Sequence, residues 1–218
     1  RKAISDSGIS VDQIAAMAVD TTCCSVVALD GSGTPVRPAL IWMDVRSAEQ
    51  AEQMVETGDD ALRINSNGCG PVSSEWMIPK ALWIKQNEPE NFDRAVTICE
   101  YQDYINLLLT GRLVASINNV SVRWHCDYSR DGVPKSLLEK LDLEELAEKW
   151  PQDVFRLGEL VGGLTPRAAG HLGLTPDLPV VQGGPDAQIG MIGLGVVKPG
   201  NLALITGSSH LHLGLSEK

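Results

Sequence analysis

Residues 178–195 read LPVVQGGPDAQIGMIGLG, and the rest of the chain is interpreted outward from this stretch. The Val-Val pair at 180–181 is β-branched and belongs to a short apolar run, which predicts a buried strand. The Gly-Gly pair at 183–184 allows a sharp turn, and Pro185 suits a first helical position, where its missing N–H would have no partner anyway. Apolar residues then continue the helix. The stretch therefore predicts a strand–turn–helix unit.

Asp186 follows this turn, at the carboxyl end of the predicted strand and in the first turn of the predicted helix. The helix dipole favours an ionised carboxylate in that position. Ligands of open α/β sheets bind at this edge of the sheet. Asp186 is therefore a candidate general base. The alternative is a purely structural role, since aspartate is common in first helical turns as a capping residue.

A second apolar strand and turn follow in residues 201–214, NLALITGSSHLHLG. The turn, Gly207-Ser208-Ser209, offers backbone N–H groups and hydroxyls that could hold a phosphate. The alternating run after it is a candidate hairpin partner, and an ordinary hairpin turn is the competing interpretation. His210 and His212 share one strand face, but the sequence offers no third ligand for a metal ion.

Strand-like and helix-like segments alternate along the rest of the chain. Strands are expected at 15–19, 26–30, 36–42, 96–99, 180–181 and 202–206. Helices are expected at 46–56, from Pro79, at 103–109, in two pieces over 136–150, and after Thr165, whereas 118–132 is expected to be irregular. This alternation predicts an α/β domain with a mixed, largely parallel sheet and flanking helices.

The overall composition narrows the class of protein. A net charge of −10 argues against a nucleic-acid partner. We find no signal peptide and no apolar run long enough to span a membrane, so a cytoplasmic protein without membrane contact is expected. The five cysteines are odd in number and form no CxxC pair, which predicts reduced thiols.

Several local motifs accompany the two glycine turns. They are Asp20-x-Thr22-x-Cys24, Trp42-x-Asp44, Ser74-Glu75-Trp76 with Pro79-Lys80, and Asp103-Tyr104 with Thr110-Gly111. In this combination the chain resembles the FGGY carbohydrate kinases, and most of all their ribulokinase and xylulokinase branches. The resemblance implies an actin–hexokinase-like (ribonuclease H-like) fold, incomplete at both ends. Residues 1–199 would be part of the N-terminal sugar-binding lobe without its first hairpin, and residues 200–218 would begin the C-terminal nucleotide-binding lobe.

The resemblance also implies a reaction, the ATP-dependent phosphorylation of a sugar hydroxyl, with ribulose or xylulose as the expected substrate. ATP and Mg²⁺ would be the cofactors, and a homodimer is an expected assembly. Asp186 would be the general base and a ligand of the metal, while Gly207, Ser208 and Ser209 would hold the ATP phosphates. The family usually has Gly-Gly-Gly-Asp, so Pro185 is a departure, although a proline is sterically acceptable there.

For the sugar, the resemblance implies five ligands: Thr22, Cys23, Trp42, Asp44 and Glu75. Trp42 would stack on the carbon skeleton, and the carboxylates would accept hydroxyl donors. The alternatives are that Trp42 belongs to the core and that Asp44 pairs with Arg46. Ser121 stands where the ribulokinase branch often has a lysine, which leaves the identity of the sugar open. The competing function is a non-catalytic fragment or sugar-binding module that lacks the nucleotide site.

Overall fold

The computed structural model describes the chain except residues 66–70, 131, 208–209 and 218. The α-helices are α1 (Lys2–Ser7), α2 (Ala48–Glu56), α3 (Met77–Asn87), α4 (Pro89–Arg94), α5 (Tyr101–Thr110), α6 (Ile117–Arg123), α7 (Lys135–Lys140), α8 (Leu146–Lys149), α9 (Pro166–Leu172) and α10 (Asp186–Gly193). The strands are β1 (Met17–Ala18), β2 (Val26–Leu29), β3 (Thr97–Glu100), β4 (Ala115–Ser116), β5 (Val154–Phe155), β6 (Leu160–Gly163), β7 (Pro179–Val181), β8 (Leu202–Thr206) and β9 (His210–Gly214). Short 3₁₀ turns occupy Val11–Gln13 and Asp60–Ile64.

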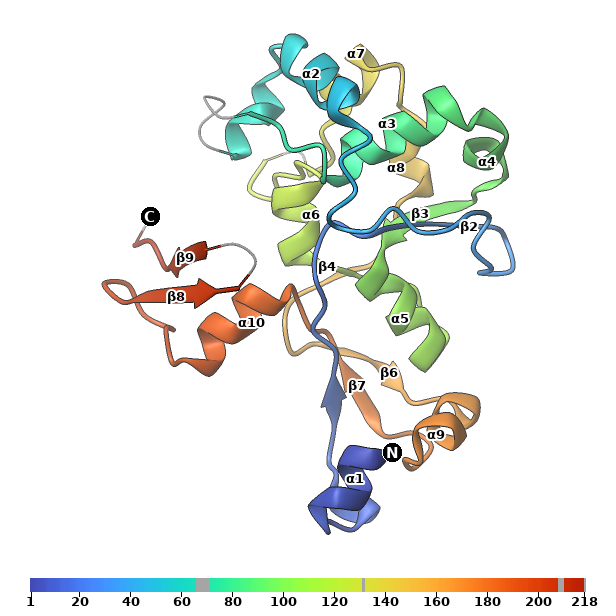
Figure 1. Cartoon of the computed structure of the whole chain (residues 1–218), viewed down its shortest axis with the longest axis vertical. Coiled ribbons are helices and arrows are strands. Elements are labelled where there is room, and N and C mark those ends of the chain that lie inside the picture. The colour runs from blue at the N-terminus through green and yellow to red at the C-terminus, as the bar shows by residue number, and fades with distance from the viewer. Residues whose placement is uncertain (66–70, 131, 208–209, 218) are drawn as a thin grey trace.

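The strands confirm the mixed α/β architecture, with fewer parallel pairs than predicted. β1 pairs with β7, and β4 with β5, in parallel. Among the described residues, the pairs β2–β3, β6–β7 and β8–β9 are antiparallel. For β8 and β9 the cause is local, because only three residues separate the two strands, and so short a connection allows only antiparallel pairing. The strand–turn–helix unit of β7 and α10 and the β8–β9 hairpin form as predicted (Figure 1).

The main hydrophobic core surrounds β2 and β3. Every residue of β2 is buried, and helices α2, α3, α4, α6, α7 and α8 contribute side chains such as Met77, Phe92 and Leu137. A smaller core forms around β7, where Val180 packs with Leu164 and Ala169. Residues 19–25 join β1, beside the smaller core, to β2 in the main core (Figure 1).

Two sequence predictions fail for identifiable reasons. The segment 36–42 does return along β2, with hydrogen bonds between Leu40 and Val26 in both directions. It forms isolated bridges rather than a strand, since Pro35 and Pro38 have no N–H to donate to a ladder. The prediction of irregular structure over 118–132 is wrong for its first part, which belongs to α6. That helix consists of weak helix formers and depends on packing against the main core.

Helix ends follow the sequence more closely. α5 ends at Gly111, whose φ of 75° is the left-handed conformation that glycine adopts most readily. Thr165 caps α9 by accepting a hydrogen bond from the Ala168 N–H at 3.2 Å. α3 begins at Met77, two residues before the predicted start, and places Pro79 in its first turn, where the N–H has no helical partner.

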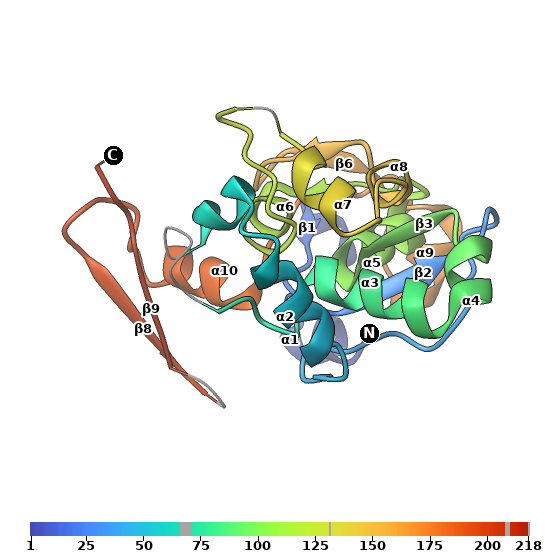
Figure 2. The same ribbon diagram turned by 90° about the horizontal axis from the view of Figure 1, so that it is seen from above.

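The β8–β9 hairpin lies to one side of the body of the molecule in both views, next to α10 (Figures 1 and 2). In the described part of the chain, no helix is both long and apolar enough to cross a bilayer.

Candidate functional site

The turn between β7 and α10 packs tightly against the segment that follows β1. A Cβ added to Gly183 would lie 2.0 Å from the Val19 carbonyl oxygen, so no other residue fits without moving the backbone. Beyond the turn, the Asp186 N–H donates to the Thr21 carbonyl oxygen at 2.9 Å. The two glycines therefore bring the start of α10 against residues 20–25, which we call the junction.

Asp186 is the first residue of α10, and Pro185 occupies the N-cap position, one residue earlier than predicted. The Asp186 side chain is exposed, and its Oδ1 accepts a hydrogen bond from the Ala187 N–H at 2.7 Å. The carboxylate thus bonds the N–H of the next residue and stays open to solvent. A carboxylate in this place can reach a hydroxyl group that lies against residues 20–25.

The junction carries two neighbouring thiols, one half-buried (Cys23) and one buried (Cys24). The Cys24 thiol donates to Cys23 Sγ across 3.6 Å. This hydrogen bond and the Arg123 guanidinium lower the pKa of the Cys23 thiol, while burial and the Asp186 carboxylate oppose them. The pKa of Cys24 is raised, because its thiol is the donor to Cys23 and is buried. Asp186 therefore lies near enough to Cys23 for their charges to interact.

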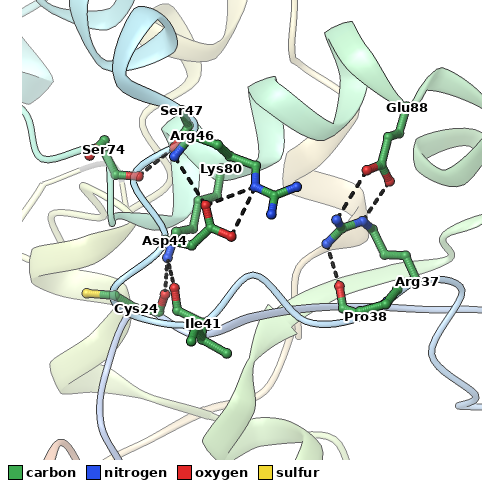
Figure 3. A network of polar contacts seen from close by, with 10 residues as sticks. All are labelled: Cys24, Arg37, Pro38, Ile41, Asp44, Arg46, Ser47, Ser74, Lys80 and Glu88. Carbon is green, nitrogen blue, oxygen red and sulfur yellow. Dashed lines mark hydrogen bonds and ion pairs between the residues drawn. The ribbon is translucent and has the colours of Figure 1, made fainter.

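Lys80 connects the junction to the segment before α2. Its ammonium group donates to the carbonyl oxygens of Cys24 and Ile41, each at 2.7 Å (Figure 3). The side chain is completely buried, and this desolvation lowers the pKa of Lys80. A buried ammonium that satisfies two carbonyls from different segments fixes the distance between them.

The segment after Ile41 carries two predicted sugar ligands. Trp42 is half-buried, and its backbone N–H donates to Ser25 Oγ at 3.1 Å. Both carboxylate oxygens of Asp44 accept from Arg46 Nε, at 2.9 and 3.0 Å (Figure 3). Arg46 thereby holds the pKa of Asp44 below its usual value. The alternative of an Asp44–Arg46 pair is therefore what the structure contains.

Glu75 stands in the loop that leads into α3, half-exposed, and the loop is tied down at Ser74, whose carbonyl oxygen accepts from Ser47 Oγ at 2.5 Å (Figure 3). The next residue, Trp76, lies under the Arg123 guanidinium, 5.6 Å from its ring centroid, and 5.3 Å from the His125 ring. Arg123 thus contacts both the junction and the loop that carries Glu75.

A buried carboxyl group lies beneath these residues. Glu100 ends β3, and its Oε1 accepts from Trp124 Nε1 at 3.3 Å. Burial raises its pKa to about 8, and the Cys23 thiolate adds to the rise, although Lys80 and Arg123 counteract it. His125 is also buried, which lowers its pKa to about 4 with help from the Arg123 charge. The floor of the site therefore holds two groups with shifted pKa values.

A family model described as the N-terminal domain of the FGGY family of carbohydrate kinases matches residues 1–193. The chain belongs to this family. It is 29% identical to a ribulokinase of Bacillus licheniformis, over 94% of this chain and 40% of the relative. It is 28% identical to an autoinducer-2 kinase of Salmonella choleraesuis, over 95% of this chain and 39% of the relative. The FGGY chain thus spans about 40% of the length of these curated relatives.

The fold of this FGGY chain matches solved sugar kinases. A ligand-bound xylulose kinase of Lactobacillus acidophilus superposes with a TM-score of 0.81 at 20% identity, covering 95% of this chain and 41% of that one. Together with the mixed sheets and flanking helices described above, this likeness confirms the predicted actin–hexokinase-like fold.

The FGGY chain brings most of the predicted site residues to one region. Thr22 and Cys23 lie on the junction that Asp186 contacts, and Lys80 links that junction to the segment of Trp42 and Asp44. Ser208 and Ser209 lie outside the described residues. Gly207 is exposed at the end of β8.

The residues that organise this region were not predicted as site residues. They are Lys80, Glu100 and Arg123. Lys80 belongs to a motif that carries the family resemblance, and Arg123 falls in the segment expected to be irregular. Two hollows, of about 1070 and 800 Å³, are present, and the second reaches His125, but neither is lined by Asp186, Trp42 or Glu75. The assembled residues, not a cavity, mark the candidate site of this FGGY domain.

The donor set fits a magnesium nucleotide only in part. Among the described residues, no group of three or more His, Cys, Asp or Glu side chains could hold a metal ion. Mg²⁺ usually needs only one or two protein carboxylates, because phosphates and water complete its shell. The exposed carboxylate of Asp186 can be such a ligand. For the ATP phosphates, the described part of the predicted turn is Gly207, where an added Cβ would meet no atom within 4 Å.

Proposed function

We propose that this FGGY domain binds the sugar in an ATP-dependent kinase that phosphorylates a hydroxyl of a ketopentose, with Asp186 as the general base. The single observation that carries the proposal is the placement of Asp186: exposed at the start of α10, and hydrogen-bonded through its backbone to the junction beside Cys23. Ribulokinases among the relatives support a pentulose as the substrate.

Asp186 would accept the proton of the attacking hydroxyl. Phosphoryl transfer needs alignment and charge neutralisation more than covalent help from the protein. The packed Gly-Gly turn keeps the backbone of Asp186 fixed against Thr21. When bound, magnesium ATP supplies the phosphoryl group, and Asp186 is the residue we propose as its metal ligand on this chain.

The sugar would lie against the junction, with Trp42 beneath its carbon skeleton and Glu75 accepting from its hydroxyls. Thr22 and Cys23 would contact it from the junction side. Asp44 would accept from the sugar while it stays paired with Arg46, because each of its carboxylate oxygens keeps a lone pair that Arg46 does not use. Because Ser121 replaces the lysine common in the ribulokinase branch, we propose pentuloses as the substrate class without distinguishing ribulose from xylulose.

The boundary between the lobes is part of the same proposal. Residues 1–199 would form the sugar side, and residues 200–218, with Gly207, Ser208 and Ser209, would begin the nucleotide side. The exposed β8–β9 hairpin beside α10 is compatible with this division.

Turnover measurements test the proposed function. The polypeptide that carries this domain is assayed for sugar-dependent ADP release with ribulose, xylulose, glycerol and autoinducer-2. We expect the highest kcat/KM with a pentulose. A higher kcat/KM with glycerol or the autoinducer would contradict the substrate class. Pentulose binding measured by calorimetry without any turnover would support the sugar-binding module instead.

A further inference from the structure

Cys23 and Cys24 form a pair of adjacent thiols, and the proposed phosphoryl transfer makes no use of their redox chemistry. Their sulfur atoms are 3.6 Å apart. Cys23 is half-buried and reachable from solution, whereas Cys24 is buried behind it. Cys24 also has a φ of 68°, a left-handed conformation that is uncommon for residues other than glycine. An accessible thiol thus has a second thiol in contact with it.

The charges around the pair favour a thiolate on Cys23. The Arg123 guanidinium lies beside it, and the Cys24 thiol donates to its sulfur. The opposing carboxylate of Asp186 is solvent-exposed, which weakens its effect. Buried Glu100 interacts with both cysteines, and its protonated form, favoured by burial, does not oppose the thiolate, whereas Lys80 lies near Cys24. Thiolate character, access and a neighbouring thiol are the features that make a cysteine sensitive to oxidation.

We propose that Cys23 and Cys24 are a modification site, at which a hydroperoxide oxidises the pair to a vicinal disulfide. In the first step the Cys23 sulfur attacks the peroxide, so that an S–O bond forms, the O–O bond breaks, and hydroxide or an alkoxide leaves. In the second step the Cys24 sulfur attacks this sulfenic acid, the S–S bond forms, and the hydroxyl group leaves with the Cys24 proton as water. Two thiols are oxidised and one hydroperoxide is reduced.

The product would be strained and readily reversed. The Cα atoms of adjacent residues are about 3.8 Å apart, whereas ordinary disulfides span roughly 4.4–6.8 Å. Closing the bond would also pull on the Cys24 carbonyl that Lys80 holds. This proposal goes beyond the proposed function, because the oxidation requires neither sugar nor nucleotide.

Peptide mass spectrometry tests the pair directly. The reduced protein is exposed to limiting hydrogen peroxide, its remaining thiols are alkylated, and the tryptic peptide with Cys23 and Cys24 is examined. We expect this peptide to lose two hydrogen atoms and to resist alkylation until it is reduced. In Cys24→Ser, Cys23 should instead form an adduct with dimedone, which traps sulfenic acids. Cys126→Ser is the matched control, since Cys126 is buried outside the pair, and it should behave like the wild type.

The alkylation rate of Cys23 in two Arg123 variants tests whether the Arg123 charge favours the Cys23 thiolate. Arg123→Met should slow alkylation of Cys23 at pH 7 several-fold, and Arg123→Lys should restore most of the rate. Circular dichroism confirms that each variant is folded. The proposal is overturned if both thiols stay open to alkylation after peroxide, if Cys24→Ser yields no dimedone adduct at Cys23, or if the disulfide joins Cys23 to a cysteine other than Cys24.

Discussion

The candidate sugar site and the β8–β9 hairpin are held in place in opposite ways. Around the site, Lys80 and Glu100 are buried and hydrogen-bonded to other segments. In the hairpin, Leu202 and Leu204 are 67% and 55% exposed, and the two strands bond mainly to each other. A lone two-stranded ribbon is marginally stable. The comparison shows that the geometry of the candidate site is fixed by tertiary contacts, while that of the hairpin is set by the hydrogen bonds between its own two strands. Substitutions should therefore have large effects in the first region and small ones in the second.

The largest effect is expected at Gly183. In Gly183→Ala the new Cβ would meet the Val19 carbonyl oxygen at 2.0 Å, so the turn before Asp186 must move. We expect a loss of unfolding free energy of about 4 kcal/mol or more, or a failure to fold. Urea denaturation measures the unfolding free energy of the variant and of the wild type. Gly193→Ala, where the added Cβ meets nothing within 4 Å, is the control, and equal losses in the two variants would contradict the tight packing of the turn.

The second-largest loss of stability is expected at Lys80. Lys80→Met keeps the length of the side chain but leaves the carbonyl oxygens of Cys24 and Ile41 without their donor. We expect unfolding free energy to fall by about 2–4 kcal/mol, since each buried unsatisfied group costs about 1–3 kcal/mol and some of this is offset by removing a buried charge. Sugar affinity should fall as well. Lys135→Met, at the start of α7, is the control. Unchanged stability in Lys80→Met would show that Lys80 does not join the two segments.

Glu100 gives the site a pH dependence of stability. Its pKa is about 8 in the folded protein and near 4.5 when unfolded, so the folded state binds more protons between these values. Stability therefore falls as pH rises through this window, by about 2 kcal/mol between pH 6.5 and 8. His125 has a pKa of about 4 in the folded protein, so its contribution lowers the stability of the fold only as the pH falls below 6.5.

Thermal melts from pH 6.5 to 8 compare the wild type with Glu100→Gln, which keeps an acceptor for Trp124. Both proteins carry the additional substitution Cys23→Ser, so that the comparison is between Cys23→Ser alone and Cys23→Ser with Glu100→Gln. This removes the Cys23 thiol, which titrates in the same pH range. The fall in stability should disappear in Glu100→Gln. An equal slope in both proteins would rule out Glu100 as its source.

The smallest effect is expected in the hairpin. Leu204→Thr changes an exposed strand residue to another residue that favours strands. We expect a change in unfolding free energy within about 0.5 kcal/mol and unaltered sugar binding by calorimetry. A loss as large as that of Lys80→Met would mean that the hairpin is packed as firmly as the sugar side.

The predictable features were those encoded in short segments. The turn at Gly183 and Gly184, the cap at Thr165 and the C-terminal Gly111 each depend on residues a few positions apart, and each was found where the sequence placed it. Lys80, Glu100 and Arg123 acquire their roles only through partners far away in the chain. No local pattern distinguishes a buried lysine that bonds two carbonyls from a lysine on a helix surface. The roles of the predicted sugar ligands remain predictions.

The most direct test of the central claim is the turnover of Asp186→Asn in the polypeptide that carries this domain. Asparagine keeps the size of the side chain but cannot accept the hydroxyl proton. We predict that kcat for the preferred pentulose falls by about 10²–10⁴-fold, that the sugar's Kd by calorimetry stays within a factor of about three, and that the exposed control Asp93→Asn behaves like the wild type. Full turnover in Asp186→Asn would contradict the assignment of Asp186 as the base.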